Sequence, residues 1–273
     1  MKHIVCYSGG HSSAVVGIEV ARRFGVDNTI LLNHDINFLV EHADIKRFKR
    51  EVAEYLGIEI TYANYHNASA DQFDICVKEK AFKGKNSPEI CTSRLKTRPF
   101  MAWLETNVPD KNCTIYYGFD DTKTERSRMQ RRIGVMGSQG YKTDYPLALW
   151  TERTIHATEE ICVGRPSTYS MFLHGNCVGC LKAGWQHWYV VYCTRPDIWL
   201  KGKWAEEEIG YAIHHGDEGP EYLEDWEPRF AAMKAAGVEP TERTPHQRFW
   251  ADARRVVPIK AVPATKPCEA CTA

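Results

Sequence analysis

The sequence predicts an α/β protein with a five-stranded, mostly parallel sheet and a C-terminal helical extension that carries cysteines. Three observations support this fold class. Short apolar runs alternate with helical segments through residues 3–162, as is typical of parallel strands joined by right-handed crossovers. A glycine-rich turn follows the first apolar run. From residue 164 onward, glycine, proline and aromatic residues interrupt the alternation.

The first three strands are short apolar runs, and the helices between them are longer. Ile45, Phe48 and Val52 recur at helical spacing, and Gly57 stands where this helix must end. In chain order, we expect strand 3–7, helix 14–24, strand 29–32, helix 41–56 and strand 58–63.

The next part of the chain is less regular. Residues 66–90 are polar and predict a helix followed by a loop, and Pro99 disturbs the helix after it. Pro146 has no backbone donor, so the fifth strand is expected at an edge of the sheet. The remaining elements are helix 92–105, strand 114–119, helix 121–133, strand 144–150 and helix 152–162.

The change in residue composition at residue 164 and the prolines after residue 238 divide the chain into three parts. We expect an α/β domain over residues 1–163, a helical cysteine-rich region over 164–237, and a proline-rich tail over 238–273. The last residues of a proline-rich terminus are commonly mobile.

Composition excludes several classes of protein. Among 273 residues, 35 are Lys or Arg and 35 are Asp or Glu, a balance unlike that of a nucleic-acid coat or a polybasic membrane binder. No run of 18 apolar residues occurs, so no membrane span is expected. The N-terminus enters a strand without an apolar signal core, which makes the cytoplasm the expected compartment.

Ten cysteines in a reducing compartment point to metal or redox chemistry rather than to disulfides. Two pairs have CxxC spacing, Cys177 with Cys180 and Cys268 with Cys271. Two thiolates at this spacing can bind one metal centre. Buried structural roles suffice for the cysteines in apolar contexts, namely Cys6, Cys76, Cys113 and Cys162.

The turn Ser8–Ser13, with sequence SGGHSS, joins the first strand to the first helix. Its two glycines let the backbone turn tightly and approach a ligand closely. The N-terminus of the following helix offers amide hydrogens and a positive dipole end, which suit a phosphate. An ordinary strand-to-helix turn is the alternative.

This turn resembles the PP-loop, SGGxDS, of the ATP pyrophosphatase and sulfonucleotide reductase superfamily, although Ser12 stands where ATP-cleaving members usually have Asp. Other segments resemble the same superfamily in the same order. They are Asn33–Asp35 with Glu41, Cys91–Lys96, Gly118–Asp120 with Glu125 and Arg126, Arg131 with Arg132, Pro146 and Leu147 with Trp150, and Gly175–Cys180.

The resemblance implies a Rossmann-like sheet of the adenine nucleotide alpha hydrolase type, which binds ATP or another adenine nucleotide beyond the carboxyl ends of its strands. Magnesium would accompany ATP. Arg128, Arg131 and Arg132 share one helix face and suit an oxyanion, or they form a solvated basic face. The nucleotide-binding residues that the resemblance implies are Ser8, Gly9, Gly10, His11, Ser12, Ser13, Asp35, Lys96, Gly118, Arg131 and Arg132.

The cysteine pattern resembles the iron–sulfur DNA-phosphorothioation branch of the superfamily, which has one upstream cysteine, a CxxC and one further cysteine. This resemblance implies a four-iron four-sulfur cluster on Cys91, Cys177, Cys180 and Cys193. Structural zinc and thiols without a metal are the alternatives. Cys193 lies in an aromatic segment, where a buried cysteine often only fills space.

Sulfonucleotide reductases carry their nucleophilic cysteine on a C-terminal tail, so Cys268 and Cys271 are candidate catalytic residues by analogy. A persulfide carrier, a resolving disulfide pair and incidental cysteines are the other interpretations. Without a cationic partner, activation of these thiols has no support in the sequence.

Together these features predict an enzyme of sulfur chemistry, an iron–sulfur, ATP-dependent adenylating sulfurtransferase that acts on a nucleotide or nucleic-acid acceptor. A sulfur-donor or reductant protein would be its partner. The alternatives are a reductase of phosphoadenosine phosphosulfate and a non-catalytic subunit that senses nucleotide or redox state.

Overall fold

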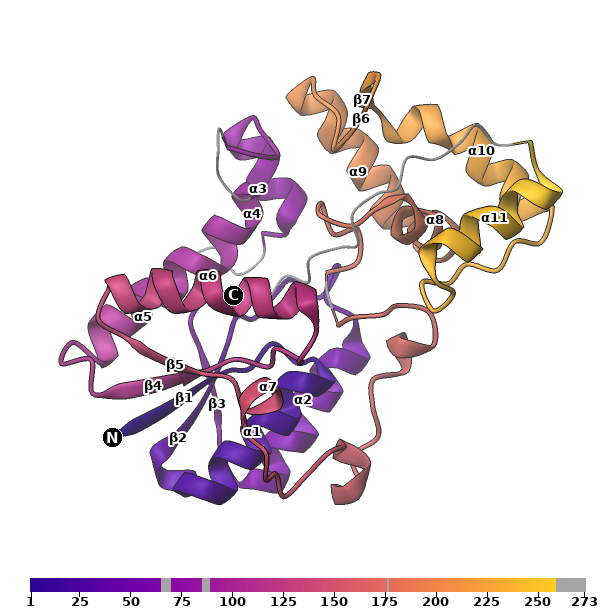
Figure 1. Cartoon of the computed structure of the whole chain (residues 1–273). Helices are drawn as coiled ribbons and strands as arrows, with labels where there is room; N and C mark the ends of the chain where they lie inside the picture. The colour runs from indigo at the N-terminus through magenta and orange to yellow at the C-terminus, as the bar shows by residue number, and fades with distance from the viewer. Residues whose placement is uncertain (65–69, 85–88, 176, 259–273) are drawn as a thin grey trace.

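The structure is a computed structural model, and it describes residues 1–64, 70–84, 89–175 and 177–258. A five-stranded sheet forms the centre of the N-terminal part (Figure 1), with strand order β3-β2-β1-β4-β5 and every neighbouring pair parallel. This confirms the predicted α/β fold class, and the sheet is fully parallel. The strands are β1 (Lys2–Cys6), β2 (Thr29–Asn33), β3 (Ile60–Tyr62), β4 (Cys113–Tyr116) and β5 (Lys142–Asp144).

The central strand is β1, which pairs with β2 on one side and β4 on the other. In register, Cys6 lies beside Leu32, and Val5 lies beside Tyr116. Along the chain, β2 and β3 extend the sheet on one side of β1, and β4 and β5 then extend it on the other side. The direction in which strands are added therefore reverses at β1. Open parallel sheets bind ligands in the crevice at such a reversal point, beyond the carboxyl ends of the strands.

Helices cover both faces of the sheet (Figure 1). Helices α1 (His11–Phe24) and α2 (Ala43–Leu56) lie on one face, and α5 (Arg98–Asn107) and α6 (Lys123–Ser138) lie on the other. Each face has its own apolar core. Phe48 and Val52 of α2 pack with Val15 of α1 on the first face, while Phe100 and Leu104 of α5 pack on the second.

Two predicted elements after the fourth strand are wrong. The fifth strand was expected at 144–150, but β5 ends at Asp144 and α7 (Pro146–Leu149) follows it. Pro146 starts this helix because a first helical position needs no backbone donor. The expected helix 152–162 is reduced to a 3₁₀ turn, Thr158–Ile161. Before it, the amide and hydroxyl of Thr154 donate to the buried carboxylate of Glu19 at 2.7 and 2.9 Å.

The helices between β3 and β4 follow the expected order with changed bounds. Helix α3 (Gln72–Glu79) is capped by Asp71, whose carboxylate accepts from the amide of Phe73 at 2.8 Å. The helix expected at 92–105 consists of α4 (Ile90–Thr92), a π-helical turn (Ser93–Thr97) and α5. Pro99 lies in the first turn of α5, where the widened turn before it tolerates the missing donor.

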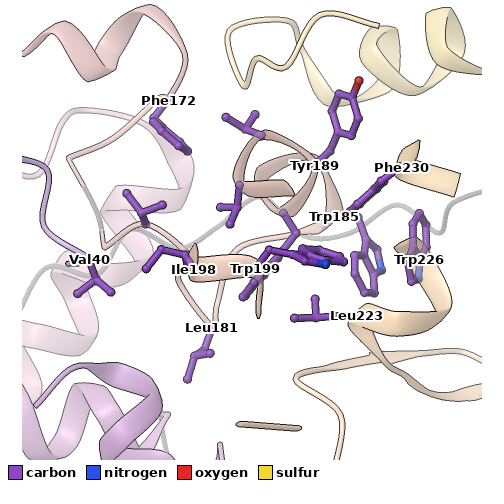
Figure 2. Close-up of a cluster of buried hydrophobic side chains, with 14 of the residues drawn as sticks. Val40, Phe172, Leu181, Trp185, Tyr189, Ile198, Trp199, Leu223, Trp226 and Phe230 are labelled. Carbon is purple, nitrogen blue, oxygen red and sulfur yellow. The ribbon is translucent and has the colours of Figure 1, made fainter. Parts of the chain in front are cut away.

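The helical region after the sheet has its own core, which Figure 2 shows. Trp185 stacks on Trp226 with ring centroids 4.2 Å apart, and Phe230 meets Trp185 edge-on at 6.1 Å. Val40, from the loop after β2, joins the same cluster. The elements are α8 (Trp185–Thr194), α9 (Pro196–Ile209), a hairpin of β6 (His214–Gly216) and β7 (Gly219–Glu221), α10 (Leu223–Ala235) and α11 (His246–Val256).

The prediction of a tail from residue 238 onward is wrong for residues 246–256, which form α11. Phe249 and Trp250 are 3% and 2% exposed and belong to the core of the helical region. With Ala253 they form one apolar face of α11, and burial of that face holds the helix against α8 and α10. Cys268 and Cys271 lie outside the described residues. None of the helices that the structure describes is both long and apolar enough to span a bilayer.

Candidate functional site

A cavity of about 320 Å³ lies beyond the carboxyl ends of β1, β2 and β4. Its volume is within the range of small-molecule sites. The cavity brings together most of the predicted nucleotide-binding residues, which come from the β1–α1 turn, the helix before β4 and the end of β4. Those that line it are Ser8, Gly10, His11, Ser12, Ser13, Lys96 and Gly118.

Close backbone approaches shape the β1–α1 turn. Gly9 has φ +83°, and a Cβ added to it would lie 2.7 Å from the Cγ of Lys49. A Cβ on Gly118 would lie 2.8 Å from the backbone nitrogen of Ser13 and 2.9 Å from the carbonyl carbon of Ser12. Gly118, just after the end of β4, therefore lies in direct contact with the backbone of the first turn of α1, and only glycine permits this contact.

A buried ion pair lies beneath the turn. Lys49 is 2% exposed, and its ammonium donates to both carboxylate oxygens of Glu41 at 3.0 and 2.9 Å and to the Oδ1 of Asn33 at 3.1 Å. The Asn33 amide donates to the carbonyl of Tyr7, whose hydroxyl donates to the carbonyl of Lys49 at 3.0 Å. Burial lowers the pKa of Lys49, and Glu41 opposes this shift. The network joins the ends of β1 and β2 to α2.

Sequence reasoning missed Lys49. Its position follows Phe48 and precedes Val52 on the apolar face of α2, and a charged residue on such a face is uncommon unless it is paired. That signal was available in the sequence. The partner was not, because Glu41 lies in the loop before the helix and reaches Lys49 only through the fold.

The mouth of the cavity carries both signs of charge. Ser12 donates to the Oδ2 of Asp120 at 3.4 Å, and Arg128 forms an ion pair with Glu125. Burial and the neighbouring Glu125 carboxylate raise the pKa of Asp120. Arg128 is 8% exposed, with its guanidinium 4.6 Å from the ring centre of Phe119. Of the three arginines on this helix face, Arg128 lines the cavity.

Four predicted nucleotide-binding residues are not among the residues that line the cavity. Gly9 lies behind the turn against Lys49. Asp35 is exposed and accepts from Lys46 at 2.6 Å. Arg131 is exposed, and the Arg132 guanidinium lies 5.3 Å from the ring centre of Tyr117.

The segment before the cysteine pair closes the cavity from the other side. The hydroxyl of Tyr169 accepts from the amide of His11 at 3.0 Å. A Cβ on Gly175 would lie 3.6 Å from the Cα of Gly10, so the two glycines pack against each other. Cys177 then lines the cavity. Sequence reasoning missed Tyr169, because no local pattern links residues that are 158 positions apart.

His11 is held as a neutral ring. Its Nε2 accepts from the amide of Thr158 at 3.4 Å. Burial lowers the pKa of His11, and Arg165 adds to this effect. The ring therefore contributes hydrogen-bonding capacity to the cavity wall rather than a positive charge.

The turn between Cys177 and Cys180 is tied at its backbone by a buried histidine. Nε2 of His187 accepts from the amides of Gly179 and Cys180 at 3.1 and 3.4 Å. The ring proton is therefore on Nδ1, which donates to the Oε1 of Glu242 at 3.0 Å. Hydrogen bonding of this kind fixes both the tautomer and the orientation of an imidazole.

The same turn is held from two other elements. Gln72 of α3 donates to the carbonyls of Val178 and Gly179 at 2.9 and 3.2 Å. The amide of Val178 donates to the carbonyl of Val40 at 2.8 Å. The cysteine pair thus sits in a turn whose backbone groups are bonded to α3, α8 and the loop after β2.

The other two predicted metal ligands differ in their placement. Cys91 lies in the short helix α4, which Glu89 precedes. Lys182, which follows the CxxC, forms an ion pair with Glu89 at 3.1 Å and so joins that segment to the start of α4. Cys193 lies on α8 and packs against the helical core, and burial raises the pKa of its thiol. Within the described ranges, no three His, Cys, Asp or Glu side chains group closely enough to hold a metal ion. The four-cysteine cluster stays a prediction.

The cavity brings together the N-terminus of α1, the basic residues Lys96 and Arg128, several apolar side chains and Cys177. Such a site can bind a molecule with an anionic group and a flat apolar part and present it to a thiol. Comparisons with profiles of known protein families, with curated proteins and with solved structures found no match to this chain.

Proposed function

We propose that this protein is an enzyme that binds an adenine nucleotide in the cavity and performs sulfur chemistry on it or with it. One observation carries the proposal. The β1–α1 turn and Cys177 line the same cavity, at the carboxyl ends of the strands where the sheet order reverses. Parallel α/β sheets bind nucleotides at this place.

The anionic part of the nucleotide would lie on the first turn of α1. This turn provides the positive end of a 14-residue helix and the hydroxyls of Ser8, Ser12 and Ser13. Lys96 and Arg128 also line the cavity and can add cationic donors, which form short, strong bonds with phosphate oxygens.

The reaction that we propose is adenylation of an acceptor oxygen by ATP, which releases pyrophosphate, followed by attack of sulfide supplied by a sulfur donor on the activated acceptor, which displaces AMP. Cys177 supports the sulfur step, because its side chain lines the cavity that would hold the activated acceptor. Asp120, which accepts from Ser12, supplies a carboxylate near the position where the superfamily pattern has Asp. Carboxylate oxygens are ligands that Mg²⁺ accepts together with phosphates.

The first test is nucleotide binding and turnover. We expect ATP to bind to the purified protein in titration calorimetry. Replacing Lys96→Met should weaken binding about 10-fold or more, since a hydrogen bond to a charged group contributes roughly 1.5–3 kcal/mol. Lys142→Met, on the exposed edge of β5, is the matched control and should bind ATP like the unmodified protein.

Products then separate the possible reactions. Release of AMP and pyrophosphate in the presence of an acceptor supports adenylation. Release of sulfite from phosphoadenosine phosphosulfate indicates the reductase instead, and binding without turnover indicates a sensing subunit. Absence of any adenine-nucleotide binding would contradict the proposal as a whole.

The iron–sulfur centre is a separate proposal, with Cys177 and Cys180 as its core ligands. Soft thiolates suit such a cluster, which takes about four cysteines. Protein purified without oxygen should be brown and contain iron. Cys177→Ser and Cys180→Ser should each lose most of that iron, whereas Cys162→Ser, at an exposed position, should keep it. Tightly bound zinc without iron would contradict the cluster and favour a structural zinc site.

A further inference from the structure

One hydroxyl in the cavity comes from outside the β1–α1 turn. Tyr169 lines the cavity, and its hydroxyl accepts from the amide of His11 at 3.0 Å. A Cβ added to Gly10 would lie 3.4 Å from this hydroxyl and 3.7 Å from the Oγ of Ser8. The phenol oxygen therefore lies at the N-terminus of α1, beside the turn on which the anionic part of the nucleotide would lie.

The protons of the serine hydroxyls in this turn are already used within the protein. Ser8 donates to the Oγ of Ser13 at 3.2 Å, and Ser13 donates to the carbonyl of Gly10 at 2.8 Å. Ser12 donates to the Oδ2 of Asp120 at 3.4 Å. Each serine must therefore give up one of these bonds before it can donate to a ligand.

The proton of the Tyr169 hydroxyl is not used in this way. The oxygen accepts from the amide of His11, and among the residues that the structure describes no group accepts the hydroxyl proton. Burial raises the pKa of Tyr169 above its usual value, against the opposing effect of the His11 amide. The hydroxyl is therefore protonated at neutral pH and can donate to a ligand in the cavity.

Two backbone amides next to this hydroxyl are also open. The amides of His11, Ser12 and Ser13 belong to the first turn of α1, where backbone donors have no partner within the helix. His11 donates to Tyr169, whereas the amides of Ser12 and Ser13 have no acceptor in the part of the chain that the structure describes. Such amides, together with a hydroxyl donor, suit the oxygens of a phosphate.

The segment that carries Tyr169 is bonded on both sides. On one side, the amide of Ser167 donates to the Oδ2 of Asp44 on α2. On the other side, the amide of Glu242 donates to the carbonyl of Met171 at 2.7 Å. A ligand that displaced Tyr169 would have to disturb these contacts. The anchoring therefore favours a ligand that accepts from the hydroxyl over one that replaces it.

We propose that Tyr169 binds the anionic group of the nucleotide. Its hydroxyl accepts from the amide of His11 and donates its own proton to a phosphate oxygen that lies near the amides of Ser12 and Ser13. Because residues 169–175 lead to the turn of Cys177, the segment that contacts the phosphate is also the one that precedes the cysteine pair. The inference rests on the proposed function and adds a binding residue to its anion site.

Tyr169→Phe tests the inference, because it removes the hydroxyl and keeps the ring. We expect the affinities for ATP and for inorganic pyrophosphate to fall by the same factor, about 10-fold or more, since the lost bond is made to a charged group. Titration calorimetry measures ATP binding, and competition with ATP measures pyrophosphate binding. The matched control is Tyr189→Phe, because the hydroxyl of Tyr189 donates to the carbonyl of Val238 at 2.7 Å, away from the cavity. Both variants should lower the melting temperature by a few degrees, and Tyr189→Phe should leave both affinities unchanged.

The direction of the change separates the possible roles of Tyr169. Unchanged affinity in Tyr169→Phe would overturn the inference. Tighter binding would overturn it as well, because the hydroxyl would then compete with the anion for the amide of His11. A loss for ATP alone, or failure of pyrophosphate to compete with ATP in the unmodified protein, would place the phosphates elsewhere and leave only the nucleotide site standing. If the unmodified protein binds no adenine nucleotide, both proposals are wrong.

Discussion

Replacing Lys49→Met is expected to lower the free energy of unfolding by about 3 kcal/mol. Removing one partner of a buried ion pair typically costs about 3–5 kcal/mol, because the remaining charge is left in an apolar environment. Lys49 is 2% exposed and Glu41 is 5% exposed. We expect a value at the low end of that range, since the ammonium of Lys46 lies 3.4 Å from the Oε2 of Glu41 and compensates in part.

Methionine keeps the apolar stem that packs beneath Gly9, so the substitution removes the charge rather than the packing. The control is the double variant Lys49→Met with Glu41→Gln, which removes both charges and should recover more than half of the lost stability. Urea denaturation of the three proteins measures these differences. A single variant as stable as the unmodified protein would contradict a structural role for the pair.

Replacing Gly118→Ala is expected to weaken nucleotide binding by at least about 10-fold. The added Cβ would lie 2.8 Å from the nitrogen of Ser13 and 2.9 Å from the carbonyl carbon of Ser12. Both are backbone atoms, so the end of β4 or the first turn of α1 must move. Overpacking of this kind costs about 1–3 kcal/mol, and 1.4 kcal/mol corresponds to a tenfold change in an equilibrium constant.

Gly134→Ala is the matched control. Gly134 lies on α6, and a Cβ there would have nothing within 4 Å. Alanine at this position should raise the free energy of unfolding by up to about 1 kcal/mol through helix propensity and leave nucleotide affinity unchanged. Calorimetric titration with ATP and thermal unfolding measure both quantities. Unchanged affinity in Gly118→Ala would mean that the anionic group does not lie on the first turn of α1.

The cavity depends on both parts of the chain. The β1–α1 turn lines it, and residues 169–175 cover the turn through the Tyr169 hydroxyl and the contact of Gly175 with Gly10. The His187–Glu242 pair extends this connection, because Glu242 also accepts from the amide of Leu173 at 3.1 Å. The cavity wall and the cysteine turn are thus bonded to the same carboxylate.

Local patterns were sufficient for the elements that depend on neighbours along the chain. The apolar runs of β1, β2 and β4 predicted buried parallel strands, and the periodicity from Ile45 to Val52 predicted α2. The pair of glycines in the β1–α1 turn predicted a tight turn at the helix N-terminus. These predictions succeeded because alternation and helical spacing reflect which face of each element is buried.

Local patterns failed where a contact decided the outcome. The prolines between residues 240 and 267 suggested a tail, yet Phe249 and Trp250 bury an apolar face of α11 against the helical core. On α6, spacing placed Arg128, Arg131 and Arg132 on one face, and packing brought Arg128 to the cavity.

The sequence by itself determined the parallel sheet, the glycine turn and the position of the cysteine pair, because each of these features depends on a pattern of residues that lie close together along the chain. Only the tertiary structure decided which side chains surround the cavity. The bond of Tyr169 to His11 joins residues 158 positions apart, and the Lys49–Glu41 pair depends on burial from several sides. Burial and hydrogen bonding of that kind depend on packing in three dimensions, which no local pattern encodes.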